Sequence, residues 1–444
     1  MFDKILMGAA GAPGGISYDY FFLTGKFGFF YQTFDVNSLA NLDVISAQSG
    51  GILLNTNDTG VQSNPRFTSN TYACLFNDSF VDSSDNIHVI GRIDEPPSSV
   101  DYPVLYIKFD NSGSILLNKT YTTSTSGHIN FGRYLKLDSF GNIYLTCYTS
   151  RSGASYTSSL IKINPSGTIL WQKTFTDNLS SNVFVRGLAV DSNDDVIISL
   201  RCGSPYGAEI IKFNSSGTLQ WSYHYSNSSS YAFFPASGGL DTDSNDNIYF
   251  GGYGGLANGM RRNTVVKLNS SGTIQWHSTN YSYSGSSQFI YGLHVSSDDK
   301  LYFCGNYYNY NTFDSHAHWT ELNTSTGAVN LARWCIFPNT NNHFFWDIKT
   351  DVDGNVVCGG YRNMPTGSEI NIARFPSDGS LTGTYNAHSD NLTYAAVSPL
   401  TTNYTALLSS GSAITTISTG TYTDSSTSFS TLYDTPNVTT TILT

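Results

Sequence analysis

Hydrophobic and polar positions alternate with a period of two along most of the chain between about residues 76 and 390, and short polar clusters interrupt this alternation at regular intervals. A period of two is typical of β-strands that bury one face. The interruptions are rich in Asp, Asn, Ser and Gly. These residues suit tight turns, because Asx side chains bond the nearby backbone and glycine accepts a positive φ. The pattern predicts a succession of β-hairpins.

Two hairpin motifs alternate in this region. The first has a lysine between two hydrophobic residues, an N-x-S-G turn and a second strand, as in "KINPSGTILWQKTF" at 162–175; close copies end at Trp221 and Trp276. The second has a turn cluster between two apolar runs, as in "VDSSDNIHVIGR" at 81–92. The turn glycines of the first motif recur roughly 50 to 55 residues apart, a period typical of one propeller blade. Two hairpins give four antiparallel strands per unit.

The repeats predict an all-β protein whose units stack. A lone four-stranded sheet exposes both of its faces to water, so the copies must pack face to face and close into a ring. Six units carry both motifs, and the two chain ends resemble fragments of one more. We therefore predict a β-propeller of seven four-stranded blades, with eight as the alternative if each end forms a whole blade. Strands from both ends in one blade would close the ring and remove exposed edges.

This fold divides the chain into three parts. We assign residues 1–17 to an N-terminal segment, 18–414 to the propeller, and 415–444 to a C-terminal tail or to closing strands. The Ser/Thr richness of the last part favours a linker, whereas its alternating apolar residues favour strand pairing.

Composition narrows the functional classes. Charged residues are 12% of the 444 residues and the net charge is −11, so the basic surface of a nucleic-acid-binding protein is not expected. The first residues include Asp3 beside Lys4 and no long apolar run, so we expect no signal peptide, no transmembrane helix and no membrane insertion. Aromatic residues reach 14%, which suits a surface that meets glycans or proteins and equally suits strand formation.

Few residues in the sequence match the spacing of a metal site. Six cysteines show no C-x-x-C and no paired spacing, so we expect free thiols. The Asp-rich turns lack the closing bidentate Glu of a calcium loop, and turn formation explains them. If a metal binds, the first choice is Asp241, Asp243 and Asn245. His316 and His318 share one face of a strand, but no third zinc ligand is suggested. We expect neither a metal nor a cofactor.

The paired motifs resemble bacterial β-propeller repeats of the forms D-x-x-G-N-I-Y-V-x-G and K-x-x-x-x-G-x-x-x-W, related to those of quinoprotein-type propellers. That resemblance covers about residues 76–390 and implies a fold rather than a function. The opening "KILMGAAGAPGG" resembles the N-terminal segment of virion and tail-appendage proteins of tailed bacteriophages, especially marine ones. It implies a virion protein made in the host cytoplasm and attached to the particle through Lys4, Ile5, Leu6 and Met7.

Motifs for catalysis are missing from the sequence, which has no G-x-S-x-G, P-loop or H-E-x-x-H. Glutamate is scarce and the aspartates mostly lie in the repeated turns, so no acid/base pair for glycoside hydrolysis can be named. The quinoprotein resemblance brings no cofactor-contacting constellation. We expect that the protein is not an enzyme.

Aromatic residues fall into two groups. Trp171, Trp221 and Trp276 occupy one repeat position, so packing between neighbouring blades is their expected role. Aromatic residues in loops between motifs are better candidates for ligand binding, because variation there disturbs the scaffold little. These candidates are Tyr307, Tyr308, Tyr310, Phe313, Tyr231, Tyr281, Tyr283, Phe345 and Trp346.

The favoured function is therefore a phage virion structural protein, a tail appendage or fibre-like module. It would bind other virion proteins through its N-terminus and present the propeller, in several copies, to a glycan or protein on the host surface. One alternative is a capsid decoration or tail hub scaffold with no receptor role. A less favoured alternative is an enzyme that degrades cell-surface polysaccharide.

Overall fold

The structure, a computed structural model, consists of β-strands joined by turns and loops. It describes residues 2–6, 21–26, 31–36, 42–46, 51–57, 60–63, 65–69, 73–94, 102–110, 113–123, 128–151, 156–176, 182–202, 207–227, 233–255, 261–281, 286–311, 314–336, 342–364, 367–380, 382–387, 390–396, 400–402, 406–409, 416–419, 422–425 and 429–433, with side chains in parts of 75–396. Within these ranges no helix is long and apolar enough to cross a membrane.

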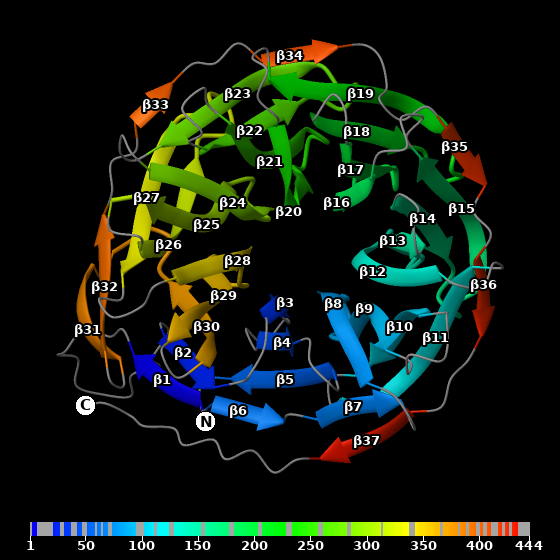
Figure 1. Ribbon diagram of the computed structural model, residues 1–444, viewed down its shortest axis with the longest axis horizontal. Helices are drawn as coiled ribbons and strands as arrows, with labels where there is room; N and C mark the ends of the chain where they lie inside the picture. The colour runs from blue at the N-terminus through cyan, green and yellow to red at the C-terminus, as the bar shows by residue number, and fades with distance from the viewer. Residues whose placement is uncertain are drawn as a thin grey trace.

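The strands form seven blades around a central axis (Figure 1), and four antiparallel strands follow one another outward in each blade. We number the blades 1 to 7 in the order of their innermost strands. These are β3 (Tyr31–Val36), β8 (Ala73–Val81), β12 (His128–Leu137), β16 (Phe184–Val190), β20 (Phe233–Thr242), β24 (Ser286–Val295) and β28 (Asn342–Thr350). The second strands are β4 (Leu42–Ser46), β9 (Ile87–Asp94), β13 (Ile143–Arg151), β17 (Val196–Cys202), β21 (Ile248–Gly255), β25 (Leu301–Asn309) and β29 (Val356–Met364).

The third and fourth strands complete each blade. The third strands are β5 (Gly51–Asn57), β10 (Val104–Phe109), β14 (Thr157–Ile163), β18 (Gly207–Phe213), β22 (Arg261–Leu268), β26 (Asp314–Leu322) and β30 (Gly367–Phe375); β5 also pairs with β6 (Gly60–Ser63). The fourth strands are β7 (Pro65–Ser69), β11 (Ile115–Thr123), β15 (Ile169–Thr176), β19 (Leu219–Asn227), β23 (Ile274–Tyr281), β27 (Val329–Ile336) and β2 (Phe21–Lys26). The prediction of an all-β propeller with seven four-stranded blades is confirmed.

The start of the chain closes the ring. Strand β2 pairs antiparallel with β30, with Leu23 opposite Ile372, so blade 7 joins an N-terminal strand to three strands from residues 342–375. Strand β1 (Phe2–Leu6) pairs with β2 and forms the outer edge of that sheet.

The end of the chain runs around the outside of the ring, against the order of the blades (Figure 1). All of its strands except β31, which pairs with β32, add to the fourth strand of a blade and cover backbone groups that an edge would expose. From blade 6 back to blade 1 these perimeter strands are β32 (Asp390–Ala396) with β31 (Gly383–Ala387), β33 (Leu400–Thr402), β34 (Ala406–Ser409), β35 (Thr416–Thr419), β36 (Tyr422–Ser425) and β37 (Phe429–Tyr433). Strand pairing is thus present within 415–444, while the three domain boundaries remain predictions.

A repeated turn joins the first and second strands of the blades. Asp82 Oδ1 accepts hydrogen bonds from the backbone N–H groups of Ser84 and Asn86, both at 2.9 Å. The fourth turn residue has a positive φ, 58° at Asp85, which only glycine and short polar residues adopt readily. Glycine occupies this position in blades 3 and 7, and aspartate occupies it in blades 2, 4, 5 and 6.

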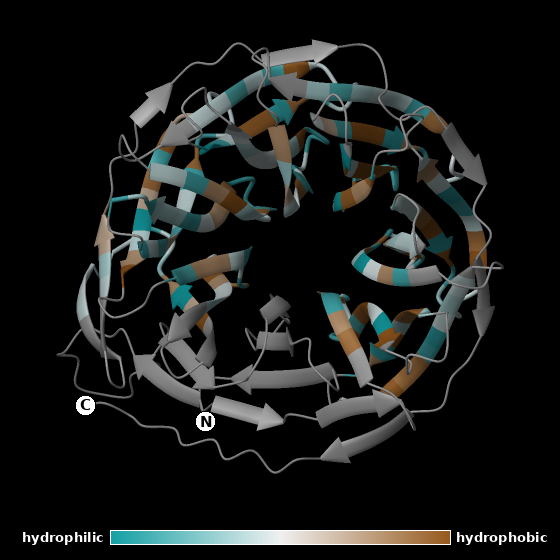
Figure 2. Cartoon of the chain, in the orientation of Figure 1, coloured by the Kyte–Doolittle hydropathy of each residue, from teal (hydrophilic) through white to brown (hydrophobic). Residues whose placement is uncertain are grey.

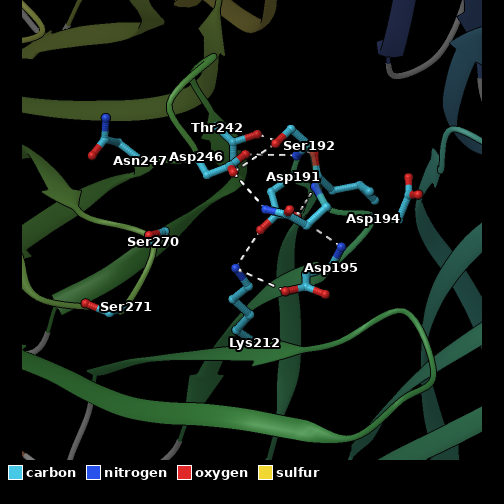
Figure 3. A network of polar contacts seen from close by, with 12 residues as sticks. Asp191, Ser192, Asp194, Asp195, Lys212, Thr242, Asp246, Asn247, Ser270 and Ser271 are labelled. Carbon is cyan, nitrogen blue, oxygen red and sulfur yellow. Dashed lines mark hydrogen bonds and ion pairs between the residues drawn. The ribbon is translucent and has the colours of Figure 1, made fainter.

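The positive-φ aspartates also tie neighbouring blades together. Asp194 Oδ1 accepts a 2.7 Å hydrogen bond from the backbone N–H of Ser139, one blade back. Asp246 accepts from Ser192 in the same way, at 2.8 Å (Figure 3). Asp299 receives a third such bond at 2.9 Å from the backbone of Ser244, whose hydroxyl also donates to it and lowers its pKa. The aspartate therefore shapes its own turn and binds the turn of the preceding blade.

The lysine of the first motif neutralises the turn aspartate of the same blade. Lys162 Nζ lies 2.9 Å from Asp138 Oδ2, with both side chains nearly inaccessible to solvent, and Lys212 pairs with Asp191 (Figure 3). A buried charge is strongly destabilising without its partner. Blade 6 changes both members together, with Ser296 and Glu321 at these positions. The conspicuous lysines are thus part of the scaffold.

The repeated tryptophans contact the following blade. Trp171 Nε1 donates to the backbone carbonyl of Ser215 at 3.1 Å, and Trp276 Nε1 donates to that of Thr324 at 3.0 Å. Trp221 makes the same contact with Ser270 at 3.3 Å. All three rings also pack against the apolar clusters between blades. Hydrophobic positions, coloured brown, recur along the strands of the blades (Figure 2).

Candidate ligand-binding cavity

A β-bulge interrupts the innermost strand of six blades at one equivalent place. In blade 2, Phe76 pairs with Gly91 and Asp78 with Ile90, so Asn77 has no residue opposite. The residues in the same situation are Gln32, Arg133, Arg186, Tyr291 and Trp346. Blade 5 has a wider bulge, 236–239. A bulge bends its strand and re-aims a side chain, so the repeat places one specially oriented residue per blade near the axis.

These side chains surround a central cavity of about 410 Å³. Its lining includes the bulged residues of blades 2, 3, 4, 5 and 7, and Tyr291 of blade 6 lies against Trp346 with ring centroids 4.1 Å apart. One backbone position thus carries an amide, two guanidinium groups, a hydroxyl and two aromatic rings. A few convergent polar groups beside aromatic surface are typical of a ligand site. We define the bulge ring as Asn77, Arg133, Arg186, Ser237, Tyr291 and Trp346.

The two arginines of the bulge ring lack a carboxylate partner. Among the ion pairs of the described residues, none includes Arg133 or Arg186. Arg186 Nη1 donates to Ser237 Oγ at 2.9 Å, but the Nε atoms of both arginines are buried without an acceptor. Burial lowers the pKa of Arg186, yet an arginine stays charged at neutral pH. The cavity wall at blades 3 and 4 therefore presents positive charge with unused donors.

Aromatic side chains form a rim on the side of the bulge ring away from the Asp turns. In blades 3, 4, 6 and 7 an aromatic residue lies two positions before the bulge, and Phe234 takes this place in blade 5. Several face an aromatic partner on the second strand, such as Phe131 and Tyr148 with centroids 4.6 Å apart. Arginines lie over these rings, with Arg92 4.2 Å from the centroid of Phe131 and Arg201 4.7 Å from that of Phe234. The rim combines flat apolar surface with positive charge.

Three carboxylates also line the cavity. Asp78 Oδ2 accepts from the backbone N–H of Leu135 in the next blade at 2.9 Å, and burial raises the pKa of Asp78 to about 6. Asp241 Oδ2 accepts from Val295 N–H at 2.9 Å. Burial alone would raise the pKa of Asp241, but His294 and nearby positive charge bring it down to about 2. Asp347, the third, accepts from the backbone N–H of Ile348.

The aromatic residues predicted from the loops differ in location and in exposure. Trp346 lines the cavity and Tyr310 is 43% exposed, with Tyr308 edge-on to it at 5.0 Å. Tyr307 is only 5% exposed and stacks on Trp334 at 4.7 Å.

Phe345 requires a correction. Its position in a loop-like stretch made it a ligand candidate, but the residue is fully buried and packs edge-on against Phe375. Trp346 lines the cavity, whereas Phe345 lies in the core cluster with Phe375. Tyr231, Tyr283 and Phe313 lie outside the described residues, as does the side chain of Tyr281.

The metal candidates do not converge on one point. Asp243 accepts from Tyr249 Oη at 2.9 Å and from the backbone of Asn245 at 3.0 Å, which is turn chemistry, while Asp241 bonds the next blade. Within the described part of the chain, no group of three or more His, Cys, Asp or Glu could hold a metal ion. His318 is buried, which lowers its pKa to about 4.

Cys304, Cys335 and Cys358 are free thiols in one core cluster. Burial raises their pKa values well above the ordinary range, so they react poorly. At the N-terminus, Lys4, Ile5 and Leu6 lie in β1 opposite Leu23, Phe22 and Phe21, and Met7 lies outside the described residues.

The sequence did contain a signal for the bulge ring. In blades 2, 3, 4, 6 and 7 the bulged residue stands five positions before the first residue of the repeated turn, as Arg133 does before Asp138. Aligning the copies on their turns and asking where they differ would have selected Arg133 and Arg186. The sequence prediction selected loop aromatic residues instead, because a bulge cannot be recognised from the hydrophobic alternation of a single copy.

No family model matches the sequence, and no curated protein matches it. Among solved structures, the chain is similar to a hypothetical protein from Leishmania major, at 10% identity over 57% of this chain and 87% of that one, with a TM-score of 0.31. It is similar to MPT-4, a mannose phosphorylase from Leishmania mexicana solved with a phosphate ion, at 10% identity, 57% and 85% coverage and a TM-score of 0.31. It is also similar to the tail fiber of Staphylococcus aureus phage P68, at 8% identity, 76% and 96% coverage and a TM-score of 0.19. At these TM-scores the likenesses carry no inference about function.

Proposed function

We propose that the protein is a structural component of a phage particle, a tail appendage or fibre-like module, whose propeller binds a ligand on the host surface through the bulge ring. The observation that carries this proposal is the bulge ring itself. One backbone position, repeated in blade after blade, places different polar and aromatic groups around one cavity of about 410 Å³. The scaffold residues of the blades repeat, whereas these do not, as expected where chemistry is selected separately from folding.

The N-terminal segment is proposed to attach the protein to other virion proteins. Its sequence resemblance supports this role, and β1 forms the outer edge of its sheet, where a strand of another subunit can add. Removal of residues 1–17 should leave the circular dichroism spectrum of a β-protein and abolish incorporation into particles. Normal incorporation of the truncated chain would refute the attachment role.

Binding is tested with purified protein on envelopes of the bacterium that the phage infects. Trp346→Ala, which removes the indole from the cavity wall, should weaken adsorption at least tenfold. Phe140→Ala is the matched control, because Phe140 is 77% exposed in the turn that follows β12 of blade 3 and does not line the cavity. Equal adsorption by both variants would count against the cavity. A folded wild-type protein that adsorbs to no envelope would favour a capsid decoration or tail hub scaffold.

One observation favours a second function, hydrolysis of a surface polysaccharide. Asp78 and Asp241 line the same cavity and their pKa values are shifted in opposite directions, to about 6 and about 2. A protonated and an ionised carboxyl are the two groups that glycoside hydrolysis requires. We rank this function second because each carboxylate accepts a hydrogen bond from the backbone of the next blade, a structural role that accounts for its burial. Reducing sugar released from envelope polysaccharide by wild type, and not by Asp78→Asn, would establish the enzyme.

A further inference from the structure

We infer that the ligand of the bulge ring is an acidic saccharide, with its anionic group between Arg133 and Arg186 and its sugar ring against Trp346. This inference rests on the proposed function and specifies the ligand class for the same site. The anionic group is a carboxylate or a phosphate, since either presents two oxygens to a guanidinium fork.

The first argument is the unused hydrogen-bonding capacity of the two arginines. They hold the same bulge position in adjacent blades and line the same cavity. Both Nε atoms are buried without an acceptor, and buried donors are strongly destabilising when no acceptor reaches them. The hydrogen bond from Arg186 to Ser237 fixes one end of its guanidinium and leaves Nε for another partner. An anion with two acceptor oxygens is the partner that fits.

The second argument is that the carboxylates of the cavity are engaged elsewhere. Asp78 and Asp241 accept backbone N–H bonds from the next blade, and Asp347 Oδ1 lies 3.9 Å from Lys349 Nζ. Other buried cations contrast with the two arginines, because Lys162 and Lys212 each have an aspartate of their own blade within 3 Å. The positive charge of Arg133 and Arg186 is thus uncompensated by a contacting carboxylate, and Lys136 adds a further cation to the lining at blade 3, whereas Asp347 of blade 7 has Lys349 beside it. An anion should therefore bind at the side of the cavity formed by blades 3 and 4.

The third argument is the aromatic surface on the opposite part of the ring. Trp346 lies over Tyr291 at 4.1 Å and is nearly parallel to Tyr361, with an interplanar angle of 15°. Its indole Nε1 is buried without an acceptor, so it offers a donor beside a flat apolar face. A sugar ring presents hydroxyl acceptors together with apolar C–H faces, which matches this pairing. A free inorganic anion would leave the aromatic side of the cavity unused.

The test compares three sugars that differ at one carbon: glucose, glucuronic acid and glucose 6-phosphate. Each is titrated into the full-length protein at low salt and followed by ligand-observed NMR. Binding of one or both acidic sugars should be at least tenfold tighter than binding of glucose, and the tighter of the two identifies carboxylate or phosphate as the source. Arg133→Met and Arg186→Met should each lower that affinity at least tenfold. Lys300→Met, which removes an exposed charge in a turn, should leave the affinity unchanged.

Arg186→Lys keeps the charge without the fork and should bind more weakly than wild type while keeping its thermal stability, which separates recognition from folding. Glucose binding as tightly as either acid would overturn the inference, as would full affinity in both methionine variants. If wild type adsorbs to host envelopes but binds neither acidic sugar, the inference fails and the proposed function stands. If it binds acidic sugars but adsorbs to no envelope, the ligand class stands and the host-surface role fails.

Discussion

The contact between a turn glycine and the tryptophan of the preceding blade gives a prediction whose size can be worked from the structure. Gly217 has a φ of +81°, and a Cβ added there would lie 2.9 Å from Trp171 Cδ2. Gly354 has a φ of +78° and nothing within 4 Å of the same added atom. Both Gly→Ala changes carry the left-handed backbone penalty, about 1 to 2 kcal/mol, and the same entropic effect on the unfolded chain. Only Gly217→Ala must also displace an indole, which costs about 1 to 3 kcal/mol more.

Gly354→Ala is therefore the matched control, and the expected difference in the free energy of unfolding between the two variants is about 1 to 3 kcal/mol. Urea denaturation followed by circular dichroism measures it. In a Trp171→Ala background the obstacle is gone, so the two glycine substitutions should then cost the same. Equal destabilisation by both substitutions in the wild-type background would refute the packing of Trp171 on the turn of the next blade.

Three further predictions concern the scaffold and its charges. The folded-state pKa of Asp78 is raised to about 6, so the stability that this group contributes is fully present below its usual pKa of 3.8 and is lost as the pH rises through 6. The unfolding free energy of Asp78→Asn relative to wild type should rise by up to about 3 kcal/mol between pH 4 and pH 7, and a flat difference would contradict the burial of this carboxyl. Asp246→Ala removes the hydrogen bonds from Ser192 and a residue suited to φ 59°, so it should destabilise by about 2 to 4 kcal/mol. Asp246→Gly should recover about 1 kcal/mol, and chemical denaturation shows whether it does. Deletion of residues 397–444 removes the perimeter strands of blades 1 to 5 and exposes their fourth strands. The truncated chain should self-associate through these edges, which sedimentation velocity measures. A monomeric truncated chain would argue against edge protection.

The repeats made the propeller predictable because each copy contains similar turn-forming residues at the same spacing. Asp82 with Asn86, and Lys162 with its N-x-S-G turn, are local signals that need no knowledge of the rest of the fold. The course of the chain end was not predictable in this way. The perimeter strands have no turn motif of their own, and their pairing depends on which blade edges remain open.

The cavity was only partly predictable for a related reason. Trp346 stood out by type, whereas Arg133 and Arg186 became candidates only once the bulges showed that one position per blade faces the axis. Phe345 was misassigned because adjacent aromatic residues around a bulge look alike in sequence, although Phe345 is fully buried in the core and Trp346 is only half-buried. A residue's chemistry is visible in the sequence, but the direction it faces is set by register.

The measurement that bears most directly on function is adsorption of the purified protein to host envelopes, compared between wild type and the combined variant Arg133→Met, Arg186→Met and Trp346→Ala. The variant alters three groups that line one cavity, and its folding is checked by circular dichroism and thermal denaturation. Loss of adsorption by a folded variant is the predicted result. Undiminished adsorption would contradict the central claim that the bulge ring binds the host-surface ligand.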